Sequence, residues 1–374
     1  MEIVVGSYDS AKVGYRLKPT SEGTSGEFPA VLVFEPRFSD VSQIGCIRCL
    51  SISEKGFLVS GSTDETIHIL DLEHGADVGS LVSHEGDVTC VRFAGKDFLY
   101  SASTDGTIRM WRARIWELQR TFKGHKGAVL SFDIHPSKKL ALSVGSDNKL
   151  IVWDLVAGKY SFIRNLRKSF DSIRFSPTGT FYVLKRDACV EIFNLSSTDC
   201  ILAHTFPEKL ETVSFISDSI LLCGSGTGKI SLFSVDSKSV ILEFPAHESR
   251  IRGAEFIVLE KNALFLITAS SDQSVKAWNI DMTQKTWRIL GVVNTGCRIT
   301  ALAIRPIPNE LDAFLAAVME KVSATVEEKE LPIESGNESV MPKCGKRVRK
   351  HLQTGTESSI TGKNTPTKKK KLVK

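Results

Sequence analysis

The sequence predicts an all-β fold, a seven-bladed β-propeller followed by a disordered, basic C-terminal tail. The main observation is a tight turn that recurs at intervals of 41, 42, 40, 40 and 45 residues. An aliphatic residue follows each turn by three positions and a bulky hydrophobic residue follows it by six. The turns are anchored at Asp64, Asp105, Asp147, Asp187, Thr227 and Asp272. This period is typical of four-stranded propeller blades, which bury their apolar faces only by stacking on one another.

Six units with the same order of elements run from about Ile44 to Asp281. Each opens with a strand of alternating character, such as Val88–Phe93, which is expected to line the inside of the ring. A second strand, such as Leu99–Ser103, leads into the anchored turn, where residues like Asp105-Gly106 suit a tight hairpin. The third strand carries the bulky residue, Trp111 in this unit.

The two ends of the propeller region supply the elements of a seventh blade. Val5–Asp9 resembles Ser60–Asp64 and is predicted to form a second strand and its turn, with an inner strand contributed by Ile299–Ile304. A blade shared in this way ties the ring shut and removes a free sheet edge. The long interval of 55 residues between Asp9 and Asp64 is explained by a polar loop at Ser21–Gly26. Residues 1–305 are therefore predicted to form seven blades, with six or eight as the alternatives.

The repeat pattern stops near Pro306. Residues 306–334 are predicted to be a linker, in which Leu311–Val322 can form a short helix, and residues 335–374 a disordered lysine-rich tail. The net charge of +5 is divided unevenly, because residues 335–374 hold 11 Lys and Arg against 2 Asp and Glu. Residues 1–334 hold 37 basic and 41 acidic residues, so the propeller is mildly acidic and the tail carries the positive charge.

The composition is that of an ordinary globular protein, with 42% hydrophobic and 24% charged residues. Met1–Ser10 lacks the layout of a signal peptide and no apolar run reaches membrane-spanning length, so no membrane partner is expected. The eight cysteines are scattered through strand-like segments, which suits a reducing compartment.

Three of the six units share four polar positions that are predicted to form a hydrogen-bonded network within the blade. A histidine precedes each unit, a hydroxyl lies four residues before the anchor aspartate, and a tryptophan lies six after it. The three sets are His84, Ser101, Asp105 and Trp111; His125, Ser143, Asp147 and Trp153; and His247, Thr268, Asp272 and Trp278. The units at Asp187 and Thr227 lack the set, and the unit at Asp64 has only Ser60 and the aspartate. Joint presence or absence indicates that the four side chains act together, since buried polar groups need partners.

A Ser-His-Asp catalytic triad is the alternative interpretation of these positions. Three copies of the set at equivalent places in the repeat are better explained as structural. The indole N–H of the tryptophan would also donate a hydrogen bond to the hydroxyl, which would then not be available as a nucleophile. The sequence therefore predicts no enzyme activity, no catalytic residues, no metal site and no cofactor.

The stretches Ser101–Trp111 and Leu150–Asp154, with the preceding Lys-Gly-His125, resemble the WD40 family. Trp153-Asp154 is the dipeptide that gives the family its name, while Trp111-Arg112 and Trp278-Asn279 depart from it. The resemblance covers about 300 residues and implies a propeller that presents surfaces to partners.

A narrower resemblance is to the PAK-kinase-interacting WD40 proteins. It is carried by Gly61–Ile69, His125-Lys-Gly127 with Ser131–Pro136, Lys139–Gly145 and Ala246-His-Glu248. It implies a nucleolar scaffold for assembly of the large ribosomal subunit and pre-rRNA processing, and a negative regulator of PAK-family kinases. Its expected partners are pre-60S assembly factors, ribosomal proteins and such a kinase, with the chain a monomer within larger complexes.

Two basic clusters in the tail are predicted to direct the chain to the nucleus and nucleolus. They comprise Lys346, Arg347, Arg349 and Lys350, and then Lys368, Lys369, Lys370 and Lys371. A flexible segment of this charge can also contact rRNA through its phosphates without sequence preference. A tail that merely solvates the protein is the alternative.

Weaker patterns have plainer explanations. Gly224–Lys229 lacks the spacing of a phosphate-binding loop, and Cys46 and Cys49 have no second pair with which to hold a metal. Trp111–Arg114 is similar to an element of WD40 substrate receptors of cullin-type ubiquitin ligases, which is the rival function, but Arg112 replaces the expected aspartate. Partners are expected on the face or rim of the ring. The candidate contact residues are Arg48, Arg92, Arg174 and Arg252.

Overall fold

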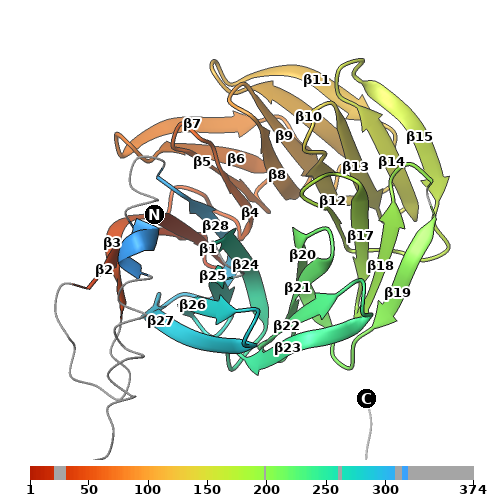
Figure 1. The fold of residues 1–374 in the computed structure, drawn as a ribbon. Coiled ribbons are helices and arrows are strands. Elements are labelled where there is room, and N and C mark those ends of the chain that lie inside the picture. The colour runs from red at the N-terminus through yellow and green to blue at the C-terminus, as the bar shows by residue number, and fades with distance from the viewer. Residues whose placement is uncertain (21–30, 198, 260–262, 308–313, 319–374) are drawn as a thin grey trace, which may run out of the picture. The chain divides into compact units, whose positions relative to one another are not determined.

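The computed structural model describes residues 1–20, 31–197, 199–259, 263–307 and 314–318. These residues form seven antiparallel four-stranded sheets arranged in a ring (Figure 1). The predicted seven-bladed propeller is thus confirmed, and the alternatives of six or eight blades are wrong.

Six blades are each built from four consecutive strands, and successive strands pair with their neighbours in the chain. The first three of these blades comprise β4 (Ile47–Ile52), β5 (Phe57–Ser62), β6 (Thr66–Asp71) and β7 (Ala76–Val82); β8 (Val88–Ala94), β9 (Phe98–Ser103), β10 (Thr107–Arg112) and β11 (Glu117–Lys123); and β12 (Val129–Ile134), β13 (Leu140–Gly145), β14 (Lys149–Asp154) and β15 (Lys159–Asn165).

The next three comprise β16 (Ser172–Phe175), β17 (Phe181–Arg186), β18 (Cys189–Asn194) and β19 (Cys200–Thr205); β20 (Leu210–Ser217), β21 (Ile220–Ser225), β22 (Lys229–Ser234) and β23 (Ser239–Pro245); and β24 (Ile251–Val258), β25 (Ala263–Ser270), β26 (Ser274–Asp281) and β27 (Thr286–Asn294). The anchored turns join the second and third strands of each blade, and the inner strands surround the centre of the ring (Figure 1).

The seventh blade, called here the closing blade, combines both ends of the propeller region. Its order is β28 (Ile299–Arg305), β1 (Glu2–Ser7), β2 (Lys12–Pro19) and β3 (Leu32–Asp40). β1 and β28 run antiparallel, with Glu2 opposite Arg305 and Val5 opposite Leu302. The ring is therefore closed by hydrogen bonds between the first and the last strand of the propeller region.

The core lies between neighbouring blades, because each sheet turns an apolar face to the next one. One cluster joins Tyr100 and Phe122 of one blade to Phe132 and Trp153 of its neighbour, with the rings of Tyr100 and Phe132 stacked 5.8 Å apart. Close inter-blade packing of this kind is what permits sheets with short, exposed outer strands to be stable.

The anchored turns require special backbone conformations. In the β21–β22 turn, Gly228 has a φ of +93°, and a Cβ there would lie 2.1 Å from the carbonyl oxygen of His247. Glycine is therefore needed at this position both for its conformation and for the close approach of the neighbouring segment.

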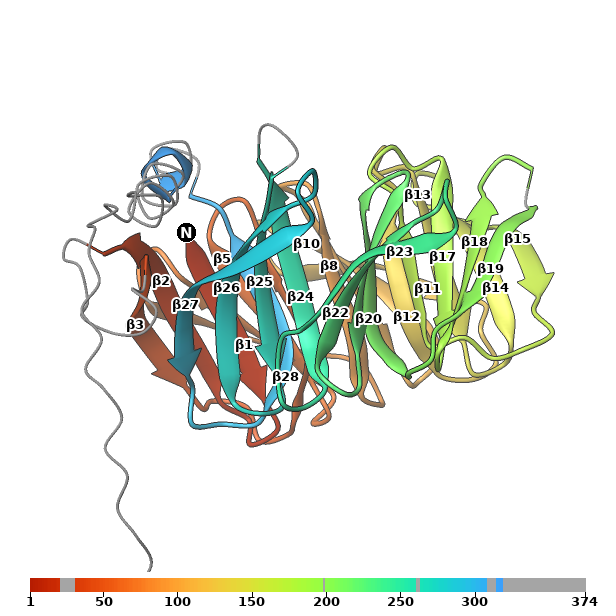
Figure 2. The same cartoon turned by 60° about the horizontal axis from the view of Figure 1, so that its bottom comes forward.

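Residues 314–318 are helical and pack beside the N-terminus (Figure 2). Phe314 and Val318 belong to a core cluster with Met1 and Phe265, and the Phe314 ring meets the Phe265 ring edge-on at 5.9 Å. The remainder of the predicted Leu311–Val322 helix, the Ser21–Gly26 loop and the basic tail lie outside the described residues. Within the described part, no helix is long and apolar enough to cross a membrane.

Candidate functional sites

The structure brings the four polar side chains together in each of three blades. His84 Nδ1 lies 2.8 Å from Asp105 Oδ2, its Nε2 lies 2.8 Å from Ser101 Oγ, and Trp111 Nε1 donates to the same hydroxyl at 2.9 Å. The corresponding distances from His125 are 2.9 Å to Asp147 and 2.7 Å to Ser143, with Trp153 donating at 2.8 Å. For His247 they are 3.0 Å to Asp272 and 2.7 Å to Thr268, with Trp278 donating at 2.8 Å.

The electrostatics of these networks favour a neutral histidine. Burial lowers the pKa of His247 to about 4, although Asp272 opposes the shift, and burial lowers the pKa values of His84 and His125 as well. Burial alone would raise the pKa of Asp105, but hydrogen bonds from His84 and Thr107 hold it below its usual range. Because the carboxylate only accepts, the imidazole donates from Nδ1, and its Nε2 accepts the hydroxyl proton.

Every donor and acceptor along this chain of bonds is therefore used within the blade. Ser101, Ser143 and Thr268 are fully buried, and each hydroxyl is shared between an imidazole and an indole. The geometry suits a structural role within each of these three blades, and these three hydroxyls are not available to a substrate.

The blade anchored at Asp64 has a fourth version of the network that the sequence reasoning missed. Gln43 takes the place of the histidine: its Oε1 accepts from Ser60 Oγ and its Nε2 donates to the Thr66 hydroxyl at 3.3 Å. Thr66 in turn donates to Asp64 Oδ1 at 2.7 Å. The spacing could have revealed it, because Gln43 precedes Asp64 by the same 21 residues that separate His84 from Asp105.

The blade anchored at Thr227 has apolar groups in place of the histidine, the hydroxyl and the tryptophan of the network. Phe206 lies 21 residues before the anchor, Cys223 stands at the hydroxyl position and Phe233 at the tryptophan position. All three are buried, and the rings of Phe206 and Phe233 pack 5.6 Å apart. A complete exchange is physically reasonable, since a half-satisfied polar network is less stable than an apolar core.

A second buried polar cluster, also missed from the sequence, joins the closing blade to the β4–β7 blade. Lys12 Nζ is fully buried and lies 2.6 Å from Asp40 Oδ2, 2.8 Å from His68 Nδ1 and 3.1 Å from Ser42 Oγ. His68 Nε2 reaches Asp77 Oδ1 at 3.0 Å. Burial lowers the pKa of Lys12, and Asp40 opposes that shift. The cluster therefore links β2 and β3 of the closing blade to β6 and β7 of the neighbouring blade.

The four arginines predicted as contact residues all line the central channel. They come from inner strands, and the channel has a cavity volume of about 230 Å³. Arg92 and Arg174 lie deeper, where Arg92 Nε is 3.6 Å from Asp133 Oδ1. Desolvation, with the charge of Arg92, lowers the pKa of Arg174. Arg48 and Arg252 lie nearer the face that carries the anchored turns, one position into their strands.

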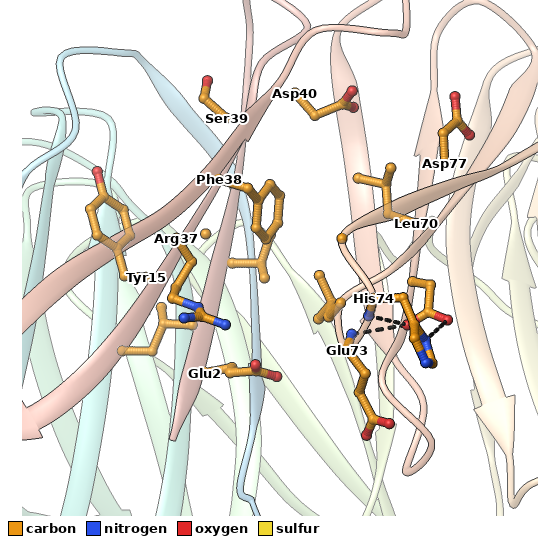
Figure 3. Close-up of a pocket in the computed structure, with 16 residues that line it drawn as sticks. Glu2, Tyr15, Arg37, Phe38, Ser39, Asp40, Leu70, Glu73, His74 and Asp77 are labelled. Atoms are coloured by element: carbon orange, nitrogen blue, oxygen red, sulfur yellow. Dashed lines mark hydrogen bonds and ion pairs between the residues drawn. The ribbon is translucent and has the colours of Figure 1, made fainter.

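A separate pocket of about 420 Å³ opens at the rim between the closing blade and the β4–β7 blade. Arg37, Phe38 and Glu2 lie on one side of it, and Leu70, Glu73 and His74 lie on the other (Figure 3). Its acidic groups have internal partners: Arg305 binds both Glu2, at 3.2 Å, and Glu73, at 2.6 Å. The pocket therefore offers a partly apolar cleft with balanced charge.

The weaker sequence patterns fall in structural positions. Lys229 is engaged by Glu208 at 2.9 Å and Glu243 at 3.2 Å. Burial raises the pKa of the Cys49 thiol, which packs against Val88 of the next blade. No group of three or more His, Cys, Asp or Glu in the described ranges could hold a metal ion. The eight tail residues predicted to direct nuclear targeting lie beyond residue 318, outside the described part.

Seven blades of this construction, three with a complete His–Asp–hydroxyl–Trp network, define a WD40-repeat propeller. A model of the WD domain, G-beta repeat, matches residues 75–112 and 116–154. The chain is 31% identical to p21-activated protein kinase-interacting protein 1-like of Danio rerio over 375 residues, which cover 100% of this chain and 96% of that protein.

Two further relatives carry similar names. Human p21-activated protein kinase-interacting protein 1 is 34% identical over 81% of this chain and 77% of its own length. Shk1 kinase-binding protein 15 of Schizosaccharomyces pombe is 30% identical over 66% of this chain and 70% of its own length. The chain therefore belongs to the family of p21-activated protein kinase-interacting protein 1 and its relatives.

Proposed function

We propose that this chain is a non-catalytic scaffold that binds a PAK-family kinase and restrains its signalling, and that also serves in nucleolar assembly of the large ribosomal subunit. The observation that carries the proposal is the match along the full chain to a protein named for its interaction with p21-activated kinase. WD40 propellers typically act by presenting surfaces to partners, which agrees with a chain that belongs to this family.

The geometry supports a binding role for the propeller. The networks that resemble triads use their polar atoms internally, whereas the channel face and the rim pocket leave charged and apolar groups open to a partner. A rigid ring with loops gathered on its faces is suited to holding several proteins at once.

The ribosomal part of the proposal is supported by the family resemblance and by the basic tail. Eleven Lys and Arg in residues 335–374 suit import into the nucleus, retention in the nucleolus and contact with rRNA phosphates. The expected partners are pre-60S assembly factors and ribosomal proteins, with the chain a monomer inside those complexes.

Kinase binding is tested by co-purifying the full chain with a PAK-family kinase from the same organism, followed by a kinase assay with the purified pair. We expect a complex and reduced phosphorylation of substrate. A kinase that neither binds nor changes activity, in the presence of well-folded chain, would contradict this part.

The ribosomal role is tested by depletion and sucrose-gradient profiles. We expect a deficit of large subunits that the full chain restores; unchanged subunit ratios and rRNA processing would contradict it. Localisation is tested with fluorescent fusions in which Lys346, Arg347, Arg349 and Lys350 and Lys368–Lys371 are changed to Gln. Nucleolar accumulation that survives all eight changes would contradict the targeting role of the tail.

A further inference from the structure

Four arginines gather at one mouth of the central channel with little countercharge. Arg48, Arg250 and Arg298 are exposed and Arg252 is partly buried. Glu211 is the carboxylate that pairs with the cluster, at 3.4 Å from Arg252 Nη1. Burial lowers the pKa of Arg252, and the charges of Arg250, Arg298 and Arg48 add to that effect. At ion-pair distance, the described residues give one carboxylate for these four guanidinium groups, and an anionic partner would relieve their mutual repulsion.

The cluster spans three consecutive blades. Arg48 lies on β4, Arg250 immediately precedes β24 and Arg252 is the second residue of that strand. Arg298 immediately precedes β28, which packs between β4 and β24. Within the described residues, neither Arg48 nor Arg250 has a carboxylate at ion-pair distance, although Arg252 does. Strands and short loops therefore hold the backbones of the four arginines in place, and the guanidinium groups of Arg48 and Arg250 are available to pair with an anionic ligand.

Exposed apolar side chains border the same mouth. Tyr8 is 59% exposed and lies under Arg298, whose guanidinium carbon is 5.6 Å from the ring centroid. Ile44 is 92% exposed, and its backbone oxygen accepts from Ser10 Oγ in the loop that follows Tyr8. Val41, in the same loop as Ile44, is 69% exposed. Arginine and aromatic side chains are enriched at protein–protein interfaces, and exposed apolar side chains that lie together mark such surfaces.

We propose that the surface formed by Arg48, Arg250, Arg252, Arg298, Tyr8 and Ile44 binds an acidic peptide segment that carries an apolar side chain. The carboxylates of the segment pair with the arginines, and its apolar residue packs on Tyr8 and Ile44. This deepens the proposed function, on which it rests, by assigning the chemistry of a partner to one face of the ring.

The surroundings favour a peptide over a nucleic acid. Exposed carboxylates of Asp9, Glu65 and Glu248 flank the arginines on the adjoining loops. They interrupt the positive surface within a few residues and would repel a continuous phosphate backbone. A peptide can place its acidic groups at the arginines alone. It can also place its apolar residue on Tyr8 and Ile44, where a phosphate group would gain no favourable contact.

The test measures binding of a short fluorescein-labelled peptide of aspartate and glutamate with one central leucine, by fluorescence anisotropy. The protein is the full chain with the eight basic tail residues changed to Gln, because the tail itself would attract an acidic probe. We expect Arg48→Ala with Arg298→Ala to weaken binding about tenfold, and Ile44→Ser about threefold. Arg167→Ala, an exposed arginine on a loop at the far side of the ring, is the matched control and should leave binding unchanged.

Three outcomes would overturn the proposal. The first is that changing the eight tail residues alone abolishes peptide binding, and the second is that Arg167→Ala weakens peptide binding as much as the arginine variants do. The third is that the arginine variants lose binding of poly(U) RNA to the same extent as binding of the peptide. Circular dichroism and melting of each variant establish that it is folded. The kinase experiment separates this inference from the proposed function. If Arg48→Ala with Arg298→Ala leaves kinase binding and peptide binding intact, the surface is wrong and the function stands. If the peptide binds and the kinase does not, the surface stands and the kinase role is wrong.

Discussion

Replacement of Ser143 by alanine provides the sharpest test of the polar networks. Ser143 is fully buried, and its Oγ is the atom that joins His125 Nε2, at 2.7 Å, to Trp153 Nε1, at 2.8 Å. Alanine fits the space without strain but leaves one acceptor and one donor without a partner in a region that excludes water.

The cost follows from those two atoms. Each buried polar group that loses its partner costs about 1–3 kcal/mol, and a small adjustment of the imidazole would recover part of it. We therefore expect the free energy of unfolding to fall by about 2–4 kcal/mol. For a propeller of this size, an unfolding entropy of about 2 cal/mol/K per residue turns this into a decrease in Tm of about 3–6 °C.

The assay is thermal and urea unfolding of the single variants Ser143→Ala and Trp153→Phe and of the double variant. Because phenylalanine removes the stranded indole donor, the double variant should lose less than the singles added together, by about 1 kcal/mol. Ser169→Ala, an exposed serine in the next loop, is the matched control and should change the Tm by less than about 1 °C. An unchanged Tm for Ser143→Ala, or strict additivity in the cycle, would refute the network.

Three further outcomes are expected. His247 stays neutral in the folded state down to about pH 4, whereas in the unfolded state it takes up a proton near pH 6.5, so acidification through this window removes about 3 kcal/mol of stability. In urea unfolding, the His247→Gln variant should therefore lose less stability than the unmodified chain between pH 7 and 4.5. An identical loss of stability would contradict the assignment of a neutral histidine. Gly228→Ala should lower the free energy of unfolding by about 2–4 kcal/mol, because the residue has a φ of +93° and the new Cβ would lie 2.1 Å from a carbonyl oxygen. Gly226→Ala, where the nearest atom would be 3.5 Å from the new Cβ, should cost under about 1 kcal/mol. Equal melting temperatures for the two variants would count against the turn geometry. Arg305→Ala should lower stability by about 1–3 kcal/mol, because it leaves the largely buried Glu2 carboxylate of the closing blade without its cation and breaks the ion pair with Glu73 of the next blade. Lys18→Ala, at an exposed ion pair, should cost under about 0.5 kcal/mol, and the reverse order of the two effects would refute this interpretation.

The fold could be predicted from the sequence because a repeated unit gives many independent chances to recognise it. The same turn and the same buried positions recur at Asp105, Asp147 and Asp272, so errors in one blade do not hide the others. The closing blade could also be recognised from the sequence. Val5–Asp9 repeats the pattern of the second strand of a blade, but no inner strand precedes it in the chain.

Sites formed between blades were harder to predict, because their members come from distant parts of the chain. Lys12 and His68 are 56 positions apart. Lys12 stands three residues after Asp9, where the other units have an aliphatic residue, and histidine does not recur at the position of His68, so the repeat pattern does not connect the two side chains. The role of Gln43 was not predicted for a different reason. The pattern specified a histidine at this position, although a side-chain amide can also form a hydrogen bond with the same hydroxyl. The arginine cluster depends on three blades meeting at the mouth, which only the closed ring determines.

The seam of the closing blade has a consequence for how the chain reaches its fold. The Thr300 hydroxyl donates to the Gly6 carbonyl oxygen at 3.1 Å, across 294 positions of sequence. During synthesis, β1 emerges first and has to wait for β28, its partner, until nearly the whole propeller has been translated. Until then its edge is open to other strands, and closure over so long a loop is entropically slow. Translation that stops before Arg305 would therefore yield a chain with an unpaired edge strand rather than a smaller propeller. We expect such fragments to aggregate or to depend on chaperones.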